Sequence, residues 1–558
     1  MESGKLTAVD LFSGAGGLSL GFLQTGQVEI AAAVENNPSA QQTYLANHPG
    51  VKMYGDIRSV DYNEILEECR AIGQGKVNIV FGGPPCQGFS NANRQKAALI
   101  SANNQLVKEY VKAIEQLKPD AFVMENVKEL KSNKHKFFLT EKDKTEVETL
   151  QIIPTNEKVS LGEAKALNEE LIVFLNDRFR AAMSDYEVHD RVLFSKLSHL
   201  NRKKKQAASY LPKTRAAIKG YLAKWNQLHH YYWNPAYQEK WKLLGNLLED
   251  ETSSLEELYL CLDEVISIQQ VIMRVGEIET NQLEAGDFYP ENNEVLVELK
   301  TYIVLDYLKA KFKSLGYKLN EQNLILNSAN FGAPQQRERL FLMGIRQELA
   351  AEEVKLPEPI IENPANFYTV KDAIEDLEHV TPLVLMEEDK PLLKTKVEQP
   401  SRLLTYLQAG TPDVSNHIMT DTRETAMQRF MMLQPGQNFH HLDESFKNTY
   451  SNPNRTQNTV YLRLKYNAPS GTVLNARKSM WIHPIQNRAI SIREAARLQT
   501  FPDDFIFRGA KDAQYQQVGN AVPPLLGRAV ADRLLMYLDR VPTQSLESII
   551  KPLELADL

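Results

Sequence analysis

Five short apolar segments in the first 130 residues constrain the fold of this chain most strongly, because helix signals or glycine-rich turns separate them. The segments are Leu6 to Phe12, Val28 to Glu35, Val51 to Ile57, Val77 to Phe81 and Ala121 to Met124. Apolar strands that alternate with helices are typical of a parallel sheet covered on both faces. Such sheets bind ligands beyond the carboxyl ends of their strands, so the residues that follow each segment are the first candidates for a site.

Length and composition exclude several classes of protein. At 558 residues the chain is too long for one ordinary domain, and 43% hydrophobic with 24% charged residues fits a soluble globular chain. No segment approaches the roughly 18 to 20 consecutive apolar residues of a membrane helix. The N-terminus lacks a secretion signal. Three cysteines, none in a metal-binding spacing, predict a reducing compartment without a disulfide framework or a metal site.

Glycines and carboxylates at successive strand ends predict a nucleoside-bearing cofactor. The first strand leads into the cluster from Asp10 to Gly17, where glycines permit a tight turn and close approach of a ligand. Glu35 ends the second strand, where a carboxylate can accept hydrogen bonds from ribose hydroxyls, and Asp56 ends the third. The cluster has no Walker lysine, so the ligand need not be a phosphate. Taken alone, the glycine cluster is equally compatible with a plain tight turn.

Cys86 is the candidate nucleophile. It follows Pro84-Pro85 at the end of the fourth strand, where two prolines stiffen the chain that presents the thiol at the sheet edge. The usual role of a cytosolic cysteine is that of a small buried hydrophobe, and we assign that role to Cys69 and Cys261. Glu125 ends the fifth strand, and a carboxylate buried there would need a partner.

Eight sequence blocks, in this order, resemble the DNA cytosine-5 methyltransferase family of the bacterial restriction–modification type. They are Asp10 to Gly17, Glu35-Asn36, Asp56-Ile57, Gly83 to Ser90, Glu125-Asn126-Val127, Gln335 to Gly344, Arg493 to Pro502 and Gln517 to Pro524. The resemblance implies an α/β, Rossmann-like, S-adenosylmethionine-dependent methyltransferase domain, with a mostly parallel sheet and helices on both faces. It also implies a smaller, mixed target-recognition domain. The resemblance does not cover residues 131–320, where the family has a short crossover, and apolar residues at three- and four-residue spacing there predict a helical insertion.

One block departs from the family pattern. The family commonly has Asp-Pro-Arg-Asn after the cysteine loop, whereas this chain has Ser101-Ala102-Asn103-Asn104. The change removes a helix-start proline and a cation, which leaves details of loop closure open and leaves the identity of the nucleophile untouched.

The resemblance implies a covalent mechanism with four catalytic residues. Cys86 would add to C6 of a cytosine flipped out of the duplex, so that C5 can take the methyl group of S-adenosylmethionine and S-adenosylhomocysteine is the product. Glu125 would contact N3 and the exocyclic amine, and Arg339 would contact O2. Arg337 would support the site or face a phosphate. No metal is implied.

The resemblance also implies which residues hold the cofactor. Phe12 would stack on the adenine, Glu35 would hold the ribose, and Asp56 would hold the adenine amino group. The full set is Phe12, Ser13, Gly14, Gly16, Gly17, Glu35, Asn36, Asp56, Ile57, Pro85, Asn520 and Val522. Because the last two lie near the C-terminus, the last helix should return to the first strand and make the catalytic domain discontinuous.

The blocks divide the chain into five segments. The catalytic domain takes 1–130, 321–346 and 506–558, the insertion takes 131–320, and the target-recognition region with its hinge takes 347–505. Residues 446–493 contain eight basic and no acidic residues, which suits contacts to phosphates. The DNA-binding candidates are Gln87, Ser90, Arg455, Arg463, Lys465, Arg477 and Lys478.

The insertion segregates its charges. Residues 191–238 hold ten Lys or Arg and no acidic residue, with aromatic residues among them, whereas residues 249–298 hold fourteen Asp or Glu and one arginine. Three interpretations are open: a helical bundle with solvated faces, a second grip on DNA, or a surface for a protein partner. The two halves can also pair with each other.

The sequence therefore predicts a DNA cytosine-5 methyltransferase that modifies one duplex sequence, either alone or beside a restriction endonuclease specific for the same sequence. We expect a monomer in the bacterial cytoplasm, associated with the nucleoid and not with a membrane. One alternative is RNA cytosine-5 methylation, which the intact Gly88-Phe89-Ser90 disfavours. The other is a catalytically idle DNA-binding regulator, which the intact Cys86, Glu125 and Arg339 disfavour.

Overall fold

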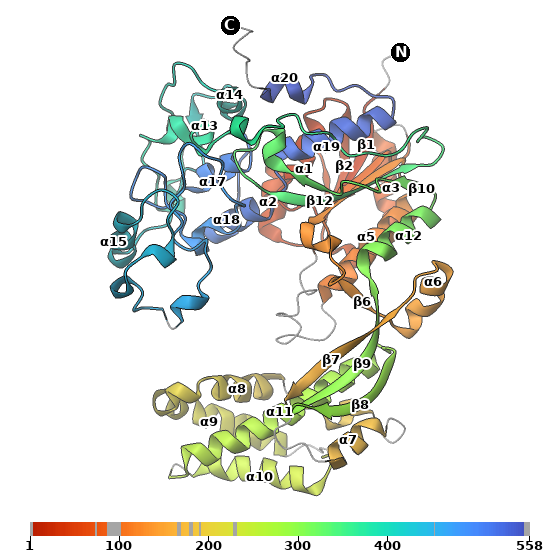
Figure 1. The fold of residues 1–558 in the computed structure, drawn as a ribbon, viewed down its shortest axis with the longest axis vertical. Helices are drawn as coiled ribbons and strands as arrows, with labels where there is room; N and C mark the ends of the chain where they lie inside the picture. The colour runs from red at the N-terminus through yellow and green to blue at the C-terminus, as the bar shows by residue number, and fades with distance from the viewer. Residues whose placement is uncertain are drawn as a thin grey trace. The chain divides into compact units, whose positions relative to one another are not determined.

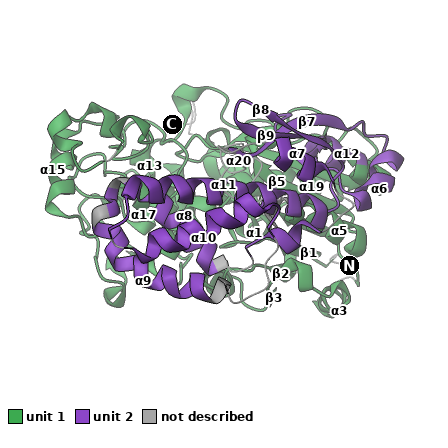
Figure 2. Cartoon of the chain, turned by 90° about the horizontal axis from the view of Figure 1, so that it is seen from below, with its two compact units in different colours: residues 1–86, 105–131, 311–558 green, residues 87–104, 132–310 purple. Residues whose placement is uncertain are grey.

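The structure, a computed structural model of the chain, divides into two compact units (Figures 1 and 2). It describes residues 4–72, 75–85, 102–163, 169–177, 182–188, 191–226, 232–250, 252–450 and 452–551. Unit 1 comprises residues 1–86, 105–131 and 311–558, and unit 2 comprises residues 87–104 and 132–310. The predicted target-recognition region, 347–505, thus belongs to the same compact unit as the catalytic sheet.

An eight-stranded sheet forms the centre of unit 1, in the order β10-β12-β5-β4-β1-β2-β3 with β11 paired to β12. Its strands are β1 (Leu6–Leu11), β2 (Val28–Val34), β3 (Lys52–Tyr54), β4 (Ile79–Gly82), β5 (Ala121–Val127), β10 (Tyr317–Leu319), β11 (Ile325–Asn327) and β12 (Glu338–Arg346). The first five strands pair in parallel, and β12 runs antiparallel to β5. The prediction of a mostly parallel α/β sheet is confirmed.

Helices cover both faces of this sheet. On one face, the ring of Phe22 from α1 stacks on Phe81 of β4, with the ring centroids 4.2 Å apart. Phe81 lies beside Val123 in the register of β4 and β5, so Phe122 points to the other face, where its ring packs against Tyr110 of α5. The helices around this sheet are α1 (Gly17–Leu23), α2 (Pro38–Asn47), α3 (Tyr62–Ile72), α5 (Ala102–Leu117), α18 (Lys511–Asn520) and α19 (Pro524–Tyr537). Helix α12 (Val304–Ser314) begins in unit 2 and ends in unit 1.

The C-terminus of the chain returns to its N-terminus. Helix α19 packs along α1 (Figure 1), and Arg528 of α19 donates to the carbonyl of Gln24 just after α1. The carbonyl oxygen of Val522 lies where the side chain of residue 17 would begin, so this close approach requires Gly17. The predicted return is observed for α19, which packs mainly on α1, whereas the last described helix, α20 (Leu546–Ile550), packs on α14 and α19.

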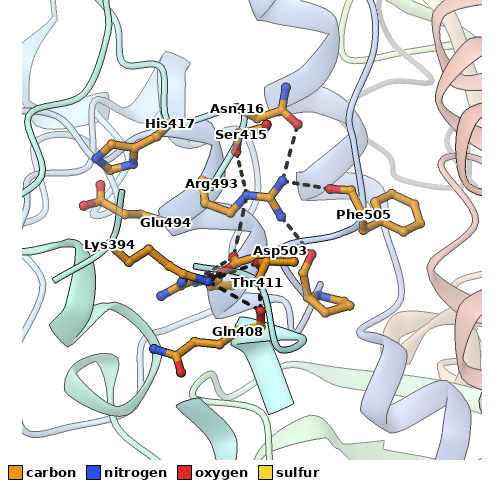
Figure 3. Close-up of polar contacts among 12 residues, drawn as sticks. Lys394, Gln408, Thr411, Ser415, Asn416, His417, Arg493, Glu494, Asp503 and Phe505 are labelled. Carbon is orange, nitrogen blue, oxygen red and sulfur yellow. Dashed lines mark hydrogen bonds and ion pairs between the residues drawn. The ribbon is translucent and has the colours of Figure 1, made fainter. Parts of the chain in front are cut away.

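Residues 347–505 form a mixture of short elements with few strands. The elements are α13 (Val370–Ile374), β13 (Leu392–Leu393), α14 (Arg402–Gln408), β14 (Asp413–Val414), α15 (Glu424–Met432), α16 (Ala476–Ser479) and α17 (Ile492–Leu498). Arg493 of α17 holds several of the loops: its buried guanidinium donates to the carbonyls of Ser415, Pro502 and Phe505 (Figure 3).

Arg497, one turn further along α17, joins carboxylates that are far apart in the sequence. Its guanidinium donates to Asp503 at 2.8 and 2.7 Å and also binds Asp376, and all three side chains are fully buried. Lys394 binds the same Asp503 at 2.7 Å, as Figure 3 shows. Burial alone would raise the pKa of Asp503, but the charge of Arg497 holds that pKa below its ordinary value.

We expect Arg497→Met to destabilise unit 1 by about 3–5 kcal/mol, because the substitution leaves the buried carboxylate of Asp376 without its cation and removes one of the two cations that bind Asp503 at 2.7 Å. Urea unfolding of the full chain measures the loss. Arg508→Met removes an exposed arginine of the same unit and should change stability by less than about 0.5 kcal/mol. Equal stability of the two variants would show that the buried network gives no net stabilisation.

Unit 2 is not purely helical, in contrast to the predicted insertion. It contains an antiparallel sheet in which β9 pairs with three other strands. The strands are β6 (Lys136–Phe138), β7 (Thr155–Glu163), β8 (Ala285–Glu291) and β9 (Glu294–Ile303). Val295, Val297 and Leu299 of β9 are buried, while the alternate positions are taken by Glu294, Leu296, Glu298 and Lys300. That alternation is a strand signal that the sequence analysis missed.

Helices form the remainder of unit 2. They are α6 (Lys144–Thr149), α7 (Glu169–Asn176), α8 (Arg191–Arg202), α9 (Ala207–Asn226), α10 (Pro235–Glu249) and α11 (Leu255–Thr280). Leucines of α8 and α9 share one apolar core with α10, α11 and the sheet. In the described parts of the chain, no helix is long and apolar enough to span a membrane.

Candidate active site

Glu125 and Arg339, two of the predicted catalytic residues, form an ion pair in unit 1 where β5 ends and β12 begins. Arg339 on β12 and Glu125 on β5 belong to neighbouring antiparallel strands, and Nε of Arg339 lies 3.0 Å from Oε1 of Glu125. Their side chains are only 12% and 13% exposed. Burial raises the pKa of Glu125 by more than the charge of Arg339 lowers it. The Glu125 carboxyl group is therefore suited to sharing a proton with a ring nitrogen.

The chain that leads to Cys86 lies against this pair. Cys86 itself, with Gln87 and Ser90, lies outside the described residues, which stop at Pro85 on this side of the loop. Nδ2 of Asn126 on β5 donates to the carbonyl of Pro84 at 2.9 Å. A Cβ atom at Gly83 would lie 2.6 Å from Oε2 of Glu125, so any larger residue there would push the Glu125 carboxylate from its position.

Asn126 has a role that the sequence analysis missed. The signal was available, because Asn126 follows Glu125 on a buried strand, where a polar side chain needs a partner. The carbonyl of Pro84 is that partner, and the hydrogen bond fixes the chain two residues before Cys86. We therefore regard Asn126 as a positioning residue for the cysteine loop.

The other two cysteines are buried and free, as predicted. Burial raises the pKa of Cys69 to about 12 and that of Cys261 to about 11. Thiols that stay protonated at neutral pH are poor nucleophiles.

Arg337 does not face a phosphate, so that part of its predicted role is wrong. The side chain is buried, and its guanidinium donates to the carbonyls of Val473 at 2.9 Å and Gly519 at 3.1 Å. Burial lowers the pKa of Arg337 to about 9. These two hydrogen bonds join the recognition region to α18. Of the two predicted roles, the supporting one therefore remains for Arg337.

Two glutamines extend this connection between blocks that are distant in the sequence. Nε2 of Gln335 donates to Oε1 of Gln499 at 2.7 Å, and Nε2 of Gln499 donates to the carbonyl of Val518 at 2.8 Å. Oε1 of Gln335 accepts from the backbone of Val473 at 2.8 Å. Gln335 before β12, Gln499 at the end of α17 and Val518 in α18 thus belong to one buried polar network.

The glycine loop after β1 closes on Glu35 at the end of β2. The backbone N–H of Gly14 donates to Oε2 of Glu35 at 2.9 Å. Phe12 has φ +58°, a conformation that is rare for a bulky residue and that often marks a functional turn. The hydroxyl of Ser13 is buried and has no hydrogen-bond partner in the described structure. An unpaired hydroxyl beside a strand-end carboxylate fits a ligand that carries its own polar groups.

The side chain of His48 lies behind the glycine loop and leaves no room for a side chain at position 16. Gly16 has φ +94°, and an added Cβ atom would collide with the imidazole of His48. His48 is buried, and its burial lowers the pKa of the ring to about 4, so the imidazole is neutral behind the loop.

The other cofactor candidates differ in their surroundings. The Asp56 carboxylate follows β3 and binds the guanidinium of Arg58, which lowers the pKa of Asp56 and competes with the predicted adenine contact. Oδ1 of Asn520 accepts from Gln516 at 2.7 Å. Ile57 and Val522 are buried, Pro85 is half-buried, and Asn36 and Asn520 are exposed.

The five described DNA-binding candidates fall into three groups. Arg455, Lys465 and Lys478 are exposed, whereas Arg477 forms an ion pair with Asp512. Arg463 is buried, and the phosphate contact predicted for it is wrong. Its guanidinium donates to the carbonyls of Phe430, Leu433, His483 and Gln486.

Comparison with known proteins agrees with this arrangement. The sequence profile of the family described as C-5 cytosine-specific DNA methylase matches residues 6–152 and 282–536. The chain is 25% identical to the type II methyltransferase M.XorII of Xanthomonas oryzae over 556 residues, which cover 97% of this chain and 87% of that protein. It is 30% identical to M.DdeI of Desulfomicrobium norvegicum over 272 residues, which cover 46% of this chain and 64% of the relative.

A solved structure supports the fold. A prophage-encoded E. coli protein, provisionally described as a DNA modification methyltransferase, superimposes with a TM-score of 0.51 at 17% identity. The match covers 96% of this chain and 100% of that protein. Because the family profile matches most of the chain and the predicted catalytic pair meets at the sheet edge, this chain belongs to the C-5 cytosine-specific DNA methylase family.

Proposed function

We propose that this protein methylates C5 of a cytosine in one duplex DNA sequence, with Cys86 as the nucleophile and S-adenosylmethionine as the methyl donor. The observation that carries the proposal is the buried ion pair between Glu125 and Arg339, 3.0 Å apart, beside the chain that leads to Cys86. In the restriction–modification setting of its relatives, such methylation protects the host sequence from an endonuclease. We place the protein in the cytoplasm, acting on DNA as a monomer.

Cys86, Glu125 and Arg339 would each have a different role in the reaction. The Cys86 thiolate adds to C6 of a flipped-out cytosine, and the electron pair displaced from the C5–C6 bond makes C5 nucleophilic. Glu125 holds a proton between its carboxyl group and N3, while Arg339 donates to O2, so both stabilise the charge that develops on the ring. Later, loss of the C5 proton restores the double bond and releases the thiolate.

The residues of the glycine loop and of the strand ends beside it suit S-adenosylmethionine. Glu35 would hold the ribose hydroxyls, Phe12 would lie against the adenine, and the unpaired hydroxyl of Ser13 would meet the methionine part. When bound, S-adenosylmethionine supplies an electrophilic methyl group. The close approach of Gly17 to Val522 brings the C-terminal segment to the same loop.

Bisulfite sequencing of DNA from cells that express the protein tests this function. We expect unconverted cytosines at one position of one recurring duplex sequence, and complete conversion in cells that carry Cys86→Ala. Bisulfite sequencing of RNA from the same cells is the control. Protected cytosines in RNA alone would favour an RNA methyltransferase, and protection in neither would favour a catalytically idle DNA-binding protein.

A further inference from the structure

Helices α8 and α9 of unit 2 carry an unusual excess of positive charge. They lie next to each other (Figures 1 and 2), and neither they nor the turn between them contain an acidic residue. Their inner sides are apolar and buried in the core of unit 2. We define the α8–α9 basic surface by five residues whose side chains are half-buried or exposed: Lys196, Arg202, Lys203, Lys204 and Lys213.

The acidic half of unit 2 does not neutralise this surface. In that half, Glu264 instead binds Lys240 of α10 at 2.5 Å, and Asp263 accepts a hydrogen bond from the neutral Asn201 of α8 at 3.0 Å. Nε of Arg202 donates to a backbone carbonyl, and Nζ of Lys203 donates to the neutral side chain of Gln206. Within the described part of unit 2, none of the five cations forms an ion pair with a carboxylate. The interpretation that the two halves pair is therefore wrong for these residues.

The aromatic side chains that the structure describes near this surface, those of Tyr210, Tyr221 and Tyr259, are already engaged. Tyr210 and Tyr221 pack against the core, and Nζ of Lys196 lies 5.4 Å from the ring centre of Tyr221. Nζ of Lys204 lies 5.9 Å from the ring centre of Tyr259, which is buried. Binding of single-stranded nucleic acid uses aromatic rings that are free to stack on bases. A surface whose described side chains offer charge without free rings is instead suited to the phosphates of a duplex.

We propose that the α8–α9 basic surface binds the phosphate backbone of duplex DNA outside the segment that the catalytic unit engages. The identity of the nucleic acid rests on the proposed function. Because the whole chain has a net charge of −7, attraction to DNA must come from local surfaces of this kind. Phosphate contacts release counterions whatever the base sequence, so this surface adds affinity without adding sequence preference.

The double variant Lys203→Glu/Lys204→Glu, made in the full chain, tests the proposal. On a non-target duplex of about 60 base pairs we expect about tenfold weaker binding, and a slope of log affinity against log salt that is shallower by about 1 to 2. On a duplex of about 15 base pairs, little more than one helical turn, we expect the variant and the wild type to bind equally.

Lys134→Glu/Lys142→Glu is the matched control. It makes the same change of charge at two exposed lysines near β6 and α6, at the other end of unit 2 (Figure 1). The proposal is overturned by an unchanged affinity and salt slope in the Lys203/Lys204 variant, by an equal loss in the control, or by an equal loss on the short duplex. If the Glu variant melts at a lower temperature, Lys203→Gln/Lys204→Gln gives the same comparison without charge reversal.

C5 methylation by the wild type is measured on the same long duplex with the target sequence inserted. Binding without methylation would count against the proposed function, while the comparison of variants would still decide the role of the basic surface. A loss of binding only to single-stranded DNA would overturn the duplex assignment.

Discussion

Cys86→Ala should lower the rate of C5 methylation by about four orders of magnitude or more, because no other group supplies the covalent addition to C6. Binding to the target duplex should persist, since the substitution removes a thiol and leaves the Glu125–Arg339 pair in place. Tritium transfer from labelled S-adenosylmethionine measures the rate, and electrophoretic mobility measures the binding.

Cys69→Ala is the matched control, because Cys69 is buried and its pKa is raised to about 12. This variant should keep its activity. A duplex with 5-fluorocytosine at the target provides a second measurement: fluorine cannot leave C5 as a proton, so the adduct with the wild type stays covalent. Such an adduct with Cys86→Ala, or methylation by that variant, would refute the assignment of the nucleophile.

Glu125→Gln should lower the turnover rate by about 10²- to 10⁴-fold, the range typical of a lost general acid or base. Glutamine keeps the shape of the side chain but cannot share a proton with N3, and it no longer forms an ion pair with Arg339. Affinity for the duplex should change much less than the turnover rate. Single-turnover kinetics together with equilibrium binding separates the two effects.

Glu338→Gln makes the same chemical change one residue from Arg339. The side chain of Glu338 is 46% exposed and binds Lys128 at 2.6 Å, so turnover should stay within about twofold of the wild type. Equal losses in Glu125→Gln and Glu338→Gln would indicate a general electrostatic effect, and the specific role of Glu125 would then be withdrawn.

The strands of the catalytic sheet could be predicted from the sequence, because they depend on short-range signals, namely apolar runs bounded by turns. That Glu125 and Arg339 belong to one site was implied only by the family resemblance, because an arginine in isolation looks like a solvated surface residue. The four-stranded sheet of unit 2 was not predicted. Strands β6 and β7 pair with β9 far along the chain, which no local signal shows. The hairpin of β8 and β9 does have a local signal, the Asn292-Asn293 turn between two β-like segments, which the sequence analysis missed.

The buried arginines show a second reason for failure. A cation in an acid-free stretch looks like a phosphate contact, and Arg463 was interpreted in that way. Its real partners are carbonyl oxygens of loops at residues 430–433 and 483–486, whose positions depend on the tertiary fold. Arg337 is similar, with partners at Val473 and Gly519. Composition identifies such charges but not the carbonyl groups that satisfy them.

The packing of α19 on α1 has a consequence for synthesis on the ribosome. Unit 2 is complete once Ala310 has been made, whereas α1 gains its partner only with residues 524–537. At about 5–20 residues per second, the interval is roughly 10 to 45 s. During that time we expect the nascent chain to carry a folded insertion and an exposed apolar surface on α1, which is a natural binding site for a chaperone.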